Sequence, residues 1–280
     1  MALHVGTSGF SFDDWVGPVY PVGTAKTRML EYYEQMLGFD SVELNFTYYT
    51  MPVPKTLESM VRRTGKGFVF VVRSHKDMTH DIWQDEARHQ LKDTTEVFKA
   101  FNEGIKPLVE SGRLGCVLVQ LPVFFYPVPK NFEYLRRMPE LMPGVPLVVE
   151  FRNRAWLRDT AFRMLEQTGM GFCIVDEPKL ARLMPFEPRR TSDVAYFRFH
   201  GRNQNWFSAS REERYNYLYS RAELEESLPP VRSLAAGAKD TFVFFNNCHA
   251  GAAARNALMM KGMLGLIEAL TPEQTRVVEG

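Results

Sequence analysis

The segment GTSGFSFDDW, residues 6–15, follows the first run of β-type residues in the chain and decides between two folds. A doubly wound nucleotide-binding sheet usually carries G-x-G-x-x-G after its first strand, and residues 6–15 do not have this spacing. The other arrangement open to alternating strands and helices is a closed barrel of parallel strands. The segment therefore favours the barrel.

Along the rest of the chain, short apolar runs rich in β-branched or aromatic residues alternate with longer amphipathic stretches. The predicted strands are residues 3–7, 41–46, 67–74, 115–121, 146–152, 171–175, 194–200 and 241–246. The predicted helices are residues 26–37, 55–63, 87–109, 132–137, 156–167, 211–227 and 252–270. Eight strand units with intervening helices predict the α/β class, with a single (β/α)8 TIM barrel domain over residues 1–280.

The composition is that of an ordinary globular protein. The 280 residues carry 34 Lys+Arg against 33 Asp+Glu, a net charge of +1, so there is no global attraction to nucleic acid or to an anionic membrane. The three cysteines, Cys116, Cys173 and Cys248, form no C-x-x-C pair, which is typical of a reducing compartment. No run approaches the ~20 apolar residues that span a bilayer. We therefore expect a cytoplasmic protein without a membrane segment, and the sequence sets no oligomeric state.

Polar residues interrupt the ends of the predicted strands, where TIM barrels place their active sites. Three strands carry polar pairs two residues apart, hence on one face: Glu43 with Asn45, Glu150 with Arg152, and Arg198 with His200. The other strand ends contribute Arg73, Gln120, Asp176, Asn246 and Asn247.

Two interpretations of this ring of charges stay open. Charged groups inside a barrel are costly unless they are paired or contact a ligand. Glu43, Glu150, Arg152, Arg198 and His200 could neutralise one another as a structural network of ion pairs. They could also form a ligand site at the mouth of the barrel, and we favour this interpretation because it is the usual location in this fold.

Several longer segments together match one known family. They are GTSGF (6–10) with Trp15, VELNFTYYTMP (42–52), the pair Thr79 and His80, LGCVLVQLP (114–122), VVEFRNRAW (148–156), YFRFHGR (196–202) and FFNN (244–247). With these motifs the chain resembles the DUF72 or YecE-like family of uncharacterised TIM-barrel proteins from Gly6 to about Met260. The resemblance implies a (β/α)8 fold but no activity. It places the polar positions of the family pattern on Glu43, Asn45, His80, Gln120, Glu150, Arg152, Arg198, His200 and Asn246.

From these residues we expect an enzyme, a hydrolase or a lyase, acting on a small polar, anionic or phosphate-bearing substrate. Glu43, Glu150 and His200 are the predicted acid–base residues. The guanidinium groups of the mouth would bind phosphate or carboxylate oxygens. The predicted substrate-binding residues are Asn45, Arg73, His80, Gln120, Arg152, Asp176, Arg198, Asn246, Asn247 and Trp15. No cofactor and no metal ligand is predicted.

Three alternatives remain. Glu43, Glu150, Asp176, His80 and His200 could hold a divalent metal in a phosphodiester hydrolase with the architecture of endonuclease IV. Glu43 and Glu150 could be the two carboxylates of a glycosidase. The barrel could also bind nucleic acid without chemistry, which the neutral net charge disfavours. The aromatic residues Trp15, Tyr48, Tyr49, Trp156 and Trp206 could stack on a sugar or a base, although capping of the barrel is the favoured role for most of them.

Overall fold

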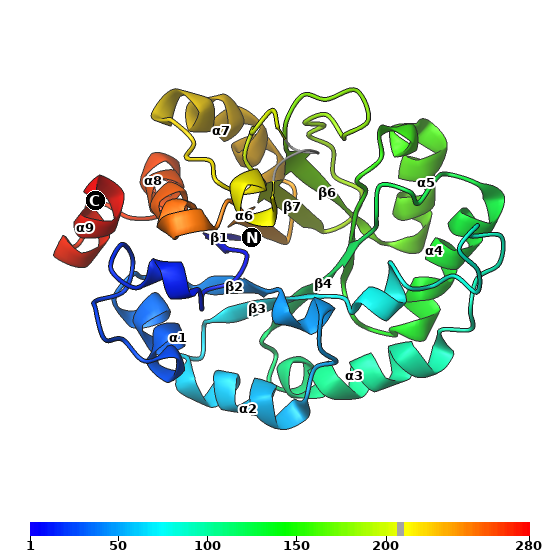
Figure 1. Cartoon of the computed structure of the whole chain (residues 1–280), viewed down its shortest axis with the longest axis horizontal. Coiled ribbons are helices and arrows are strands. Elements are labelled where there is room, and N and C mark those ends of the chain that lie inside the picture. Colours follow the sequence, from blue (N-terminus) through cyan, green and yellow to red (C-terminus); the bar gives the residue numbers. More distant parts are fainter. Residues whose placement is uncertain (206–209) are drawn as a thin grey trace.

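The computed structural model describes residues 1–205 and 210–280 of the chain. Parallel strands form the centre of the molecule and helices surround them (Figure 1). The strands in the described residues are β1 (Ala2–Thr7), β2 (Ser41–Leu44), β3 (Val69–Arg73), β4 (Leu114–Gln120), β5 (Leu147–Glu150), β6 (Gly171–Asp176), β7 (Val194–Phe199) and β8 (Asp240–Phe245). Each coincides with one of the runs predicted from the sequence.

The strands form one sheet in the order β1-β8-β7-β6-β5-β4-β3-β2, and every neighbouring pair is parallel. The first and last strands in this order meet through a parallel bridge between Ser8 and Glu43. There the amide of Gly9 donates to the carbonyl oxygen of Glu43 over 2.8 Å. The sheet therefore curves into a nearly closed barrel, and the predicted TIM-barrel fold is confirmed.

The helices lie outside the strands and partly follow the predicted ranges. They are α1 (Lys26–Gln35), α2 (Pro54–Arg63), α3 (Thr95–Glu110), α4 (Pro129–Leu141), α5 (Asp159–Thr168), α6 (Arg211–Arg214), α7 (Arg221–Ala235), α8 (Ala252–Leu264) and α9 (Pro272–Glu279). Short 3-10 turns follow several strands: η1 (Asp13–Trp15), η2 (Phe46–Tyr48), η3 (Lys76–Met78), η4 (Arg154–Trp156) and η5 (His249–Gly251). None of the described helices has the length and the apolar run needed to cross a bilayer.

Four predicted helices were wrong at their limits. The range 132–137 is too short, since α4 covers Pro129–Leu141. The other three start or end elsewhere because of a cap or a turn. The range 87–109 begins only at Thr95, whose amide donates to Asp93 over 3.0 Å. The range 211–227 is interrupted because Ser220 forms a capping box that starts α7. The range 252–270 ends at Leu264, where Gly265 adopts a left-handed conformation with φ 76°.

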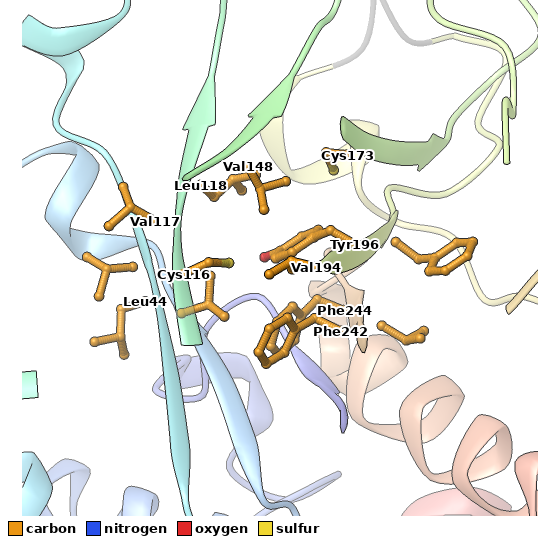
Figure 2. Packing of buried hydrophobic residues seen from close by; sticks show 14 of the residues in the cluster. Leu44, Cys116, Val117, Leu118, Val148, Cys173, Val194, Tyr196, Phe242 and Phe244 are labelled. Atoms are coloured by element: carbon orange, nitrogen blue, oxygen red, sulfur yellow. The ribbon is translucent and has the colours of Figure 1, made fainter. Parts of the chain in front are cut away.

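Apolar side chains from facing strands fill the lower part of the barrel. Figure 2 shows Cys116, Tyr196, Phe242 and Phe244 converging there from three different strands. The rings of Phe242 and Phe244 stack with centroids 5.9 Å apart, and both are buried. This packed layer leaves no room for a ligand. A ligand can therefore bind only beyond it, at the carboxyl ends of the strands, where the polar residues lie.

Replacing Gly6 by alanine is expected to destabilise the fold by about 1–3 kcal/mol. A Cβ atom at Gly6 would press against the carbonyl oxygen of Ser41 and lie 3.0 Å from the Tyr33 hydroxyl oxygen, where β1 approaches β2. Urea denaturation of the variant measures the loss. Gly67→Ala is the control, because a Cβ there meets nothing within 4 Å. Equal stability of the two variants would contradict the close approach of the strands.

Candidate active site at the mouth of the barrel

Arg198 on β7 joins two carboxylates from distant strands. Its Nη2 and Nε atoms donate to Oε1 and Oε2 of Glu43 on β2 over 2.7 and 3.0 Å. Its Nη1 donates to Oε2 of Glu150 on β5 over 2.9 Å. Tyr196 also donates its hydroxyl proton to Glu43 Oε2 over 2.6 Å. These four side chains are at most 1% exposed, so they form a fully desolvated floor beneath the mouth.

Arg152, which follows β5, extends this floor toward β6. Its Nη1 donates to Glu150 Oε1 over 2.8 Å, and its Nη2 lies 3.1 Å from Glu177 Oε2. Burial alone would raise the pKa of Glu150, but Arg198 and Arg152 outweigh this effect and hold the pKa well below its usual range. The charges of Glu43 and Glu150 are thereby balanced by those of Arg152 and Arg198.

His200 is completely buried beside Glu150 and Arg152. Its Nε2 lies 3.2 Å from Glu150 Oε1 and 2.8 Å from Arg152 Nη1, and its Nδ1 lies 3.0 Å from the side-chain nitrogen of Asn246. Burial and the positive charge of Arg152 lower the pKa of His200 to about 3. The imidazole is therefore neutral at physiological pH.

Glu177 is a member of this network that the sequence interpretation missed. Its Oε1 accepts from the amide of Met184 over 2.9 Å, and its side chain is fully buried against Arg152. Burial raises the pKa of Glu177 to about 7, although Arg152 acts in the opposite direction. The residue lies in the irregular stretch after β6, where no strand periodicity points to an inward side chain. Its position directly after Asp176 was the available signal.

Arg73, at the end of β3, differs from the other two predicted anion receptors. Among the side chains that the structure describes, its guanidinium has no ion-pair or hydrogen-bond partner, and its Nε is buried. The Cζ atom lies 3.9 Å from the centre of the Tyr48 ring. Burial and the charge of Arg198 lower the pKa of Arg73, but an arginine stays charged. Arg73 is thus an uncompensated cation. It lies at the partly exposed edge of the mouth, above the buried floor, and we call this edge the rim.

Three further predicted residues lie at this rim. His80 contacts Tyr48 edge-on, with ring centroids 5.0 Å apart, and its Nδ1 lies 2.9 Å from Thr79 Oγ1. Burial and the charge of Arg73 lower the pKa of His80 to about 4, so this imidazole is also neutral. Asn45 Oδ1 is buried without a hydrogen-bond partner among the described residues. Gln120 ends β4 in register with Glu150 and is partly exposed.

The remaining predicted residues have local partners away from the rim. Asp176 accepts from Arg202 over 2.8 Å and from the Tyr219 hydroxyl over 2.7 Å, which fixes the segment after β7. Asn247 is fully buried and donates to Tyr217 O over 2.7 Å. Trp15 is fully buried and donates its indole proton to a backbone oxygen over 2.6 Å.

The aromatic candidates separate in the same way. Trp156 is only 1% exposed and packs in the core, whereas Tyr49 at the rim is 50% exposed. Trp206 lies outside the described residues.

Comparison with known proteins identifies relatives over nearly the full length. The model of the family "Protein of unknown function DUF72" matches residues 4–277. The UPF0759 protein YunF of Bacillus subtilis (strain 168) is 30% identical, with 97% of this chain and 98% of that protein covered. The crystal structure of a DUF72 family protein from Thermotoga maritima MSB8 superposes with a TM-score of 0.88 at 46% identity, covering 95% of this chain and 100% of the other. That of a DUF72 family protein from Enterococcus faecalis V583 gives a TM-score of 0.81 at 28% identity, covering 96% and 98%. The chain therefore belongs to the DUF72 family, whose function is unknown.

Proposed function

We propose that this protein is an enzyme that binds a small anionic substrate at the mouth of the barrel, with Arg73 as the receptor for the anion. The observation that carries this proposal is the uncompensated guanidinium of Arg73, whose buried Nε has no partner among the described residues. Buried donors in folded proteins nearly always have an acceptor, so the unpaired guanidinium of Arg73 is a place where the oxygen of an anion can bind. A phosphate or carboxylate supplies oxygens in the geometry that a guanidinium fork accepts.

The balance of charges supports the same assignment. Arg152 and Arg198 are each bound to carboxylates of the floor and have little positive charge left for a ligand. Arg73 adds a positive charge above this balanced floor. An anion at the rim would therefore meet a local excess of positive charge in a place where water screens it weakly.

We assign the acid–base step to His80, because it is the neutral imidazole that reaches the surface of the rim. Glu43, Glu150 and His200, which the sequence suggested for that role, have no exposed surface in this structure. In this proposal they act as positioning residues that hold the charges of the mouth in place. A neutral imidazole accepts a proton at physiological pH, so His80 would act as the general base.

The alternative of a metal-dependent hydrolase is less well supported by the geometry. Glu43 and Glu150, which it needs as ligands, already accept hydrogen bonds from guanidinium groups. The described residues contain no group of three or more His, Cys, Asp or Glu side chains arranged to hold a metal ion. We derive no step through a metal from this arrangement.

Replacing Arg73 by glutamine is expected to weaken the binding of inorganic phosphate at least tenfold, since a hydrogen bond to a charged group contributes about 1.5–3 kcal/mol. Isothermal titration calorimetry at low salt measures the change. Arg154→Gln is the matched control, because Arg154 is an exposed arginine in the loop after β5, at the same end of the barrel. If wild type does not bind phosphate, sulfate or acetate, or if the two variants bind alike, the proposal is wrong.

A further inference from the structure

A large cavity opens beside the rim, in the loop between β3 and α3. Its volume is about 930 Å³, within the range of small-molecule sites. His80 belongs both to this cavity and to the rim of the mouth. Most of the other lining residues come from positions 77–94, the segment that joins β3 to α3.

The cavity is close enough to Arg73 for one small ligand to reach both. Arg73 Cζ lies 3.9 Å from the centre of the Tyr48 ring, and the Tyr48 and His80 ring centroids are 5.0 Å apart. The anion site of the proposed function and the cavity are therefore separated by little more than one aromatic side chain. A substrate held by its anionic group at Arg73 can place the rest of its atoms in the cavity.

Trp83 in the cavity wall has a donor without an acceptor. Its indole Nε1 is buried and has no hydrogen-bond partner in the part of the chain that the structure describes. An unsatisfied buried donor costs about 1–3 kcal/mol, so a small rotation of the indole that brings Nε1 to an acceptor atom of a ligand in the cavity would stabilise it. The loop itself is held in place, because Asp85 accepts from the amides of His89 and Gln90, each over 3.2 Å. Arg88 has a positive φ of 60°, a strained backbone of the kind found at functional sites.

The other residues that line the cavity indicate which chemical group of a ligand can accept the hydrogen bond from Trp83 Nε1. The carboxylates of the cavity are Asp77, Asp81, Asp85, Glu86 and Asp93, and its basic side chains are Arg88 and Lys92. This excess of negative charge disfavours a second anionic group as the partner of Trp83. An ammonium group only donates and would leave the indole unsatisfied. A hydroxyl group both accepts from an indole and donates to a carboxylate, and it therefore fits both parts of the wall.

We propose that the cavity binds the hydroxyl-bearing part of the substrate, which makes the substrate a sugar or polyol that carries a phosphate or carboxylate group. This inference rests on the proposed anion site at Arg73. The anionic group contacts Arg73, at least one hydroxyl oxygen accepts from Trp83 Nε1, and other hydroxyls donate to the carboxylates of the loop.

Calorimetric titrations of the wild-type protein with five probes test the proposal. The probes are inorganic phosphate, glucose, glucose 6-phosphate, gluconate and phenyl phosphate. We expect glucose 6-phosphate or gluconate to bind at least tenfold more tightly than phosphate or glucose, and the preferred one of the pair identifies the anionic group. Phenyl phosphate should bind no more tightly than phosphate. If both polyol anions bind only as well as phosphate, the inference about the cavity is wrong while the anion site stands. If phosphate, glucose 6-phosphate and gluconate all fail to bind, the anion site itself is wrong and the proposed function fails with it.

Trp83→Phe separates the two sites within one molecule. The variant keeps an aromatic ring and loses the indole donor, so the affinity for the preferred polyol anion should fall about fivefold while the affinity for phosphate stays unchanged. Arg73→Gln should instead weaken both ligands. An unchanged affinity for the polyol anion in Trp83→Phe would overturn the contact, and the unchanged phosphate affinity shows that the variant is folded.

Discussion

Replacing Arg198 by methionine is expected to lower the free energy of unfolding by about 3–5 kcal/mol, because it leaves buried carboxylates without their shared cation. Arg198 makes two hydrogen bonds to Glu43 and one to Glu150, all in a region with no exposed surface. Methionine fills much of the same volume, so the loss reports the missing charge rather than a large cavity. Guanidinium chloride denaturation followed by tryptophan fluorescence measures the difference.

Arg221→Met is the matched control for this substitution. Arg221 forms an exposed ion pair with Glu225 over 2.9 Å on the surface of α7, and such pairs contribute about 0.5 kcal/mol or less. The double variant Glu43→Gln with Arg198→Met should recover part of the loss, since Glu43, which Arg198 holds, is then uncharged, while Glu150 keeps Arg152 as a partner over 2.8 Å. Equal losses in Arg198→Met and Arg221→Met would show that the floor of the mouth is not the desolvated network described above.

The barrel could be predicted from the sequence because its strands are buried on both sides and therefore appear as continuous apolar runs. The strand predicted at residues 115–121 corresponds to β4 (Leu114–Gln120), with almost the same limits. Helix limits were less predictable, because they depend on caps. Asp93, just before the N-cap of α3, and Ser220, the N-cap of α7, lie inside stretches whose apolar spacing continues across the start of the helix. The loop before Thr95, which forms the large cavity, was for this reason assigned in part to a helix.

The convergence of charged residues at the mouth was predictable from spacing alone. Glu150 and Arg152 lie two apart, and the structure joins them over 2.8 Å. The pairing between strands was not predictable, because it depends on which side chains face one another across the barrel. Arg198 and Arg152 are neutralised and Arg73 is not, yet the three look alike in the sequence. The sequence left two interpretations of these charges open, a structural ion-pair network and a ligand site. The buried floor has the geometry of an ion-pair network, and the rim has the unpaired cation that the proposed function uses.

The buried titratable groups at the mouth predict how the free energy of unfolding changes with pH. The pKa values of His80 and His200 are lowered from 6.5 to about 4 and about 3, so both stay neutral in the folded protein while the unfolded chain protonates them. Their contribution is complete above pH 6.5 and is lost as the pH falls. The pKa of Glu177 is raised from 4.5 to about 7, so its contribution is complete below pH 4.5 and is lost as the pH rises through 7. Between pH 4.5 and 6.5 the unfolded chain therefore binds one proton more than the folded protein.

One proton corresponds to a slope of about 1.4 kcal/mol per pH unit, with stability falling toward acid. Glu177→Gln removes the opposing group, and the slope between pH 4.5 and 6.5 should then double to about 2.7 kcal/mol per pH unit. His200→Gln removes one of the two histidines and should make the curve nearly flat over the same interval. Denaturation curves at half-unit steps of pH measure all three slopes, and the comparison is independent of any constant loss of stability that a variant suffers. A slope in Glu177→Gln equal to that of the wild type would mean that Glu177 is ionised in the folded protein, and the buried carboxylate beside Arg152 would then be an ordinary ion pair.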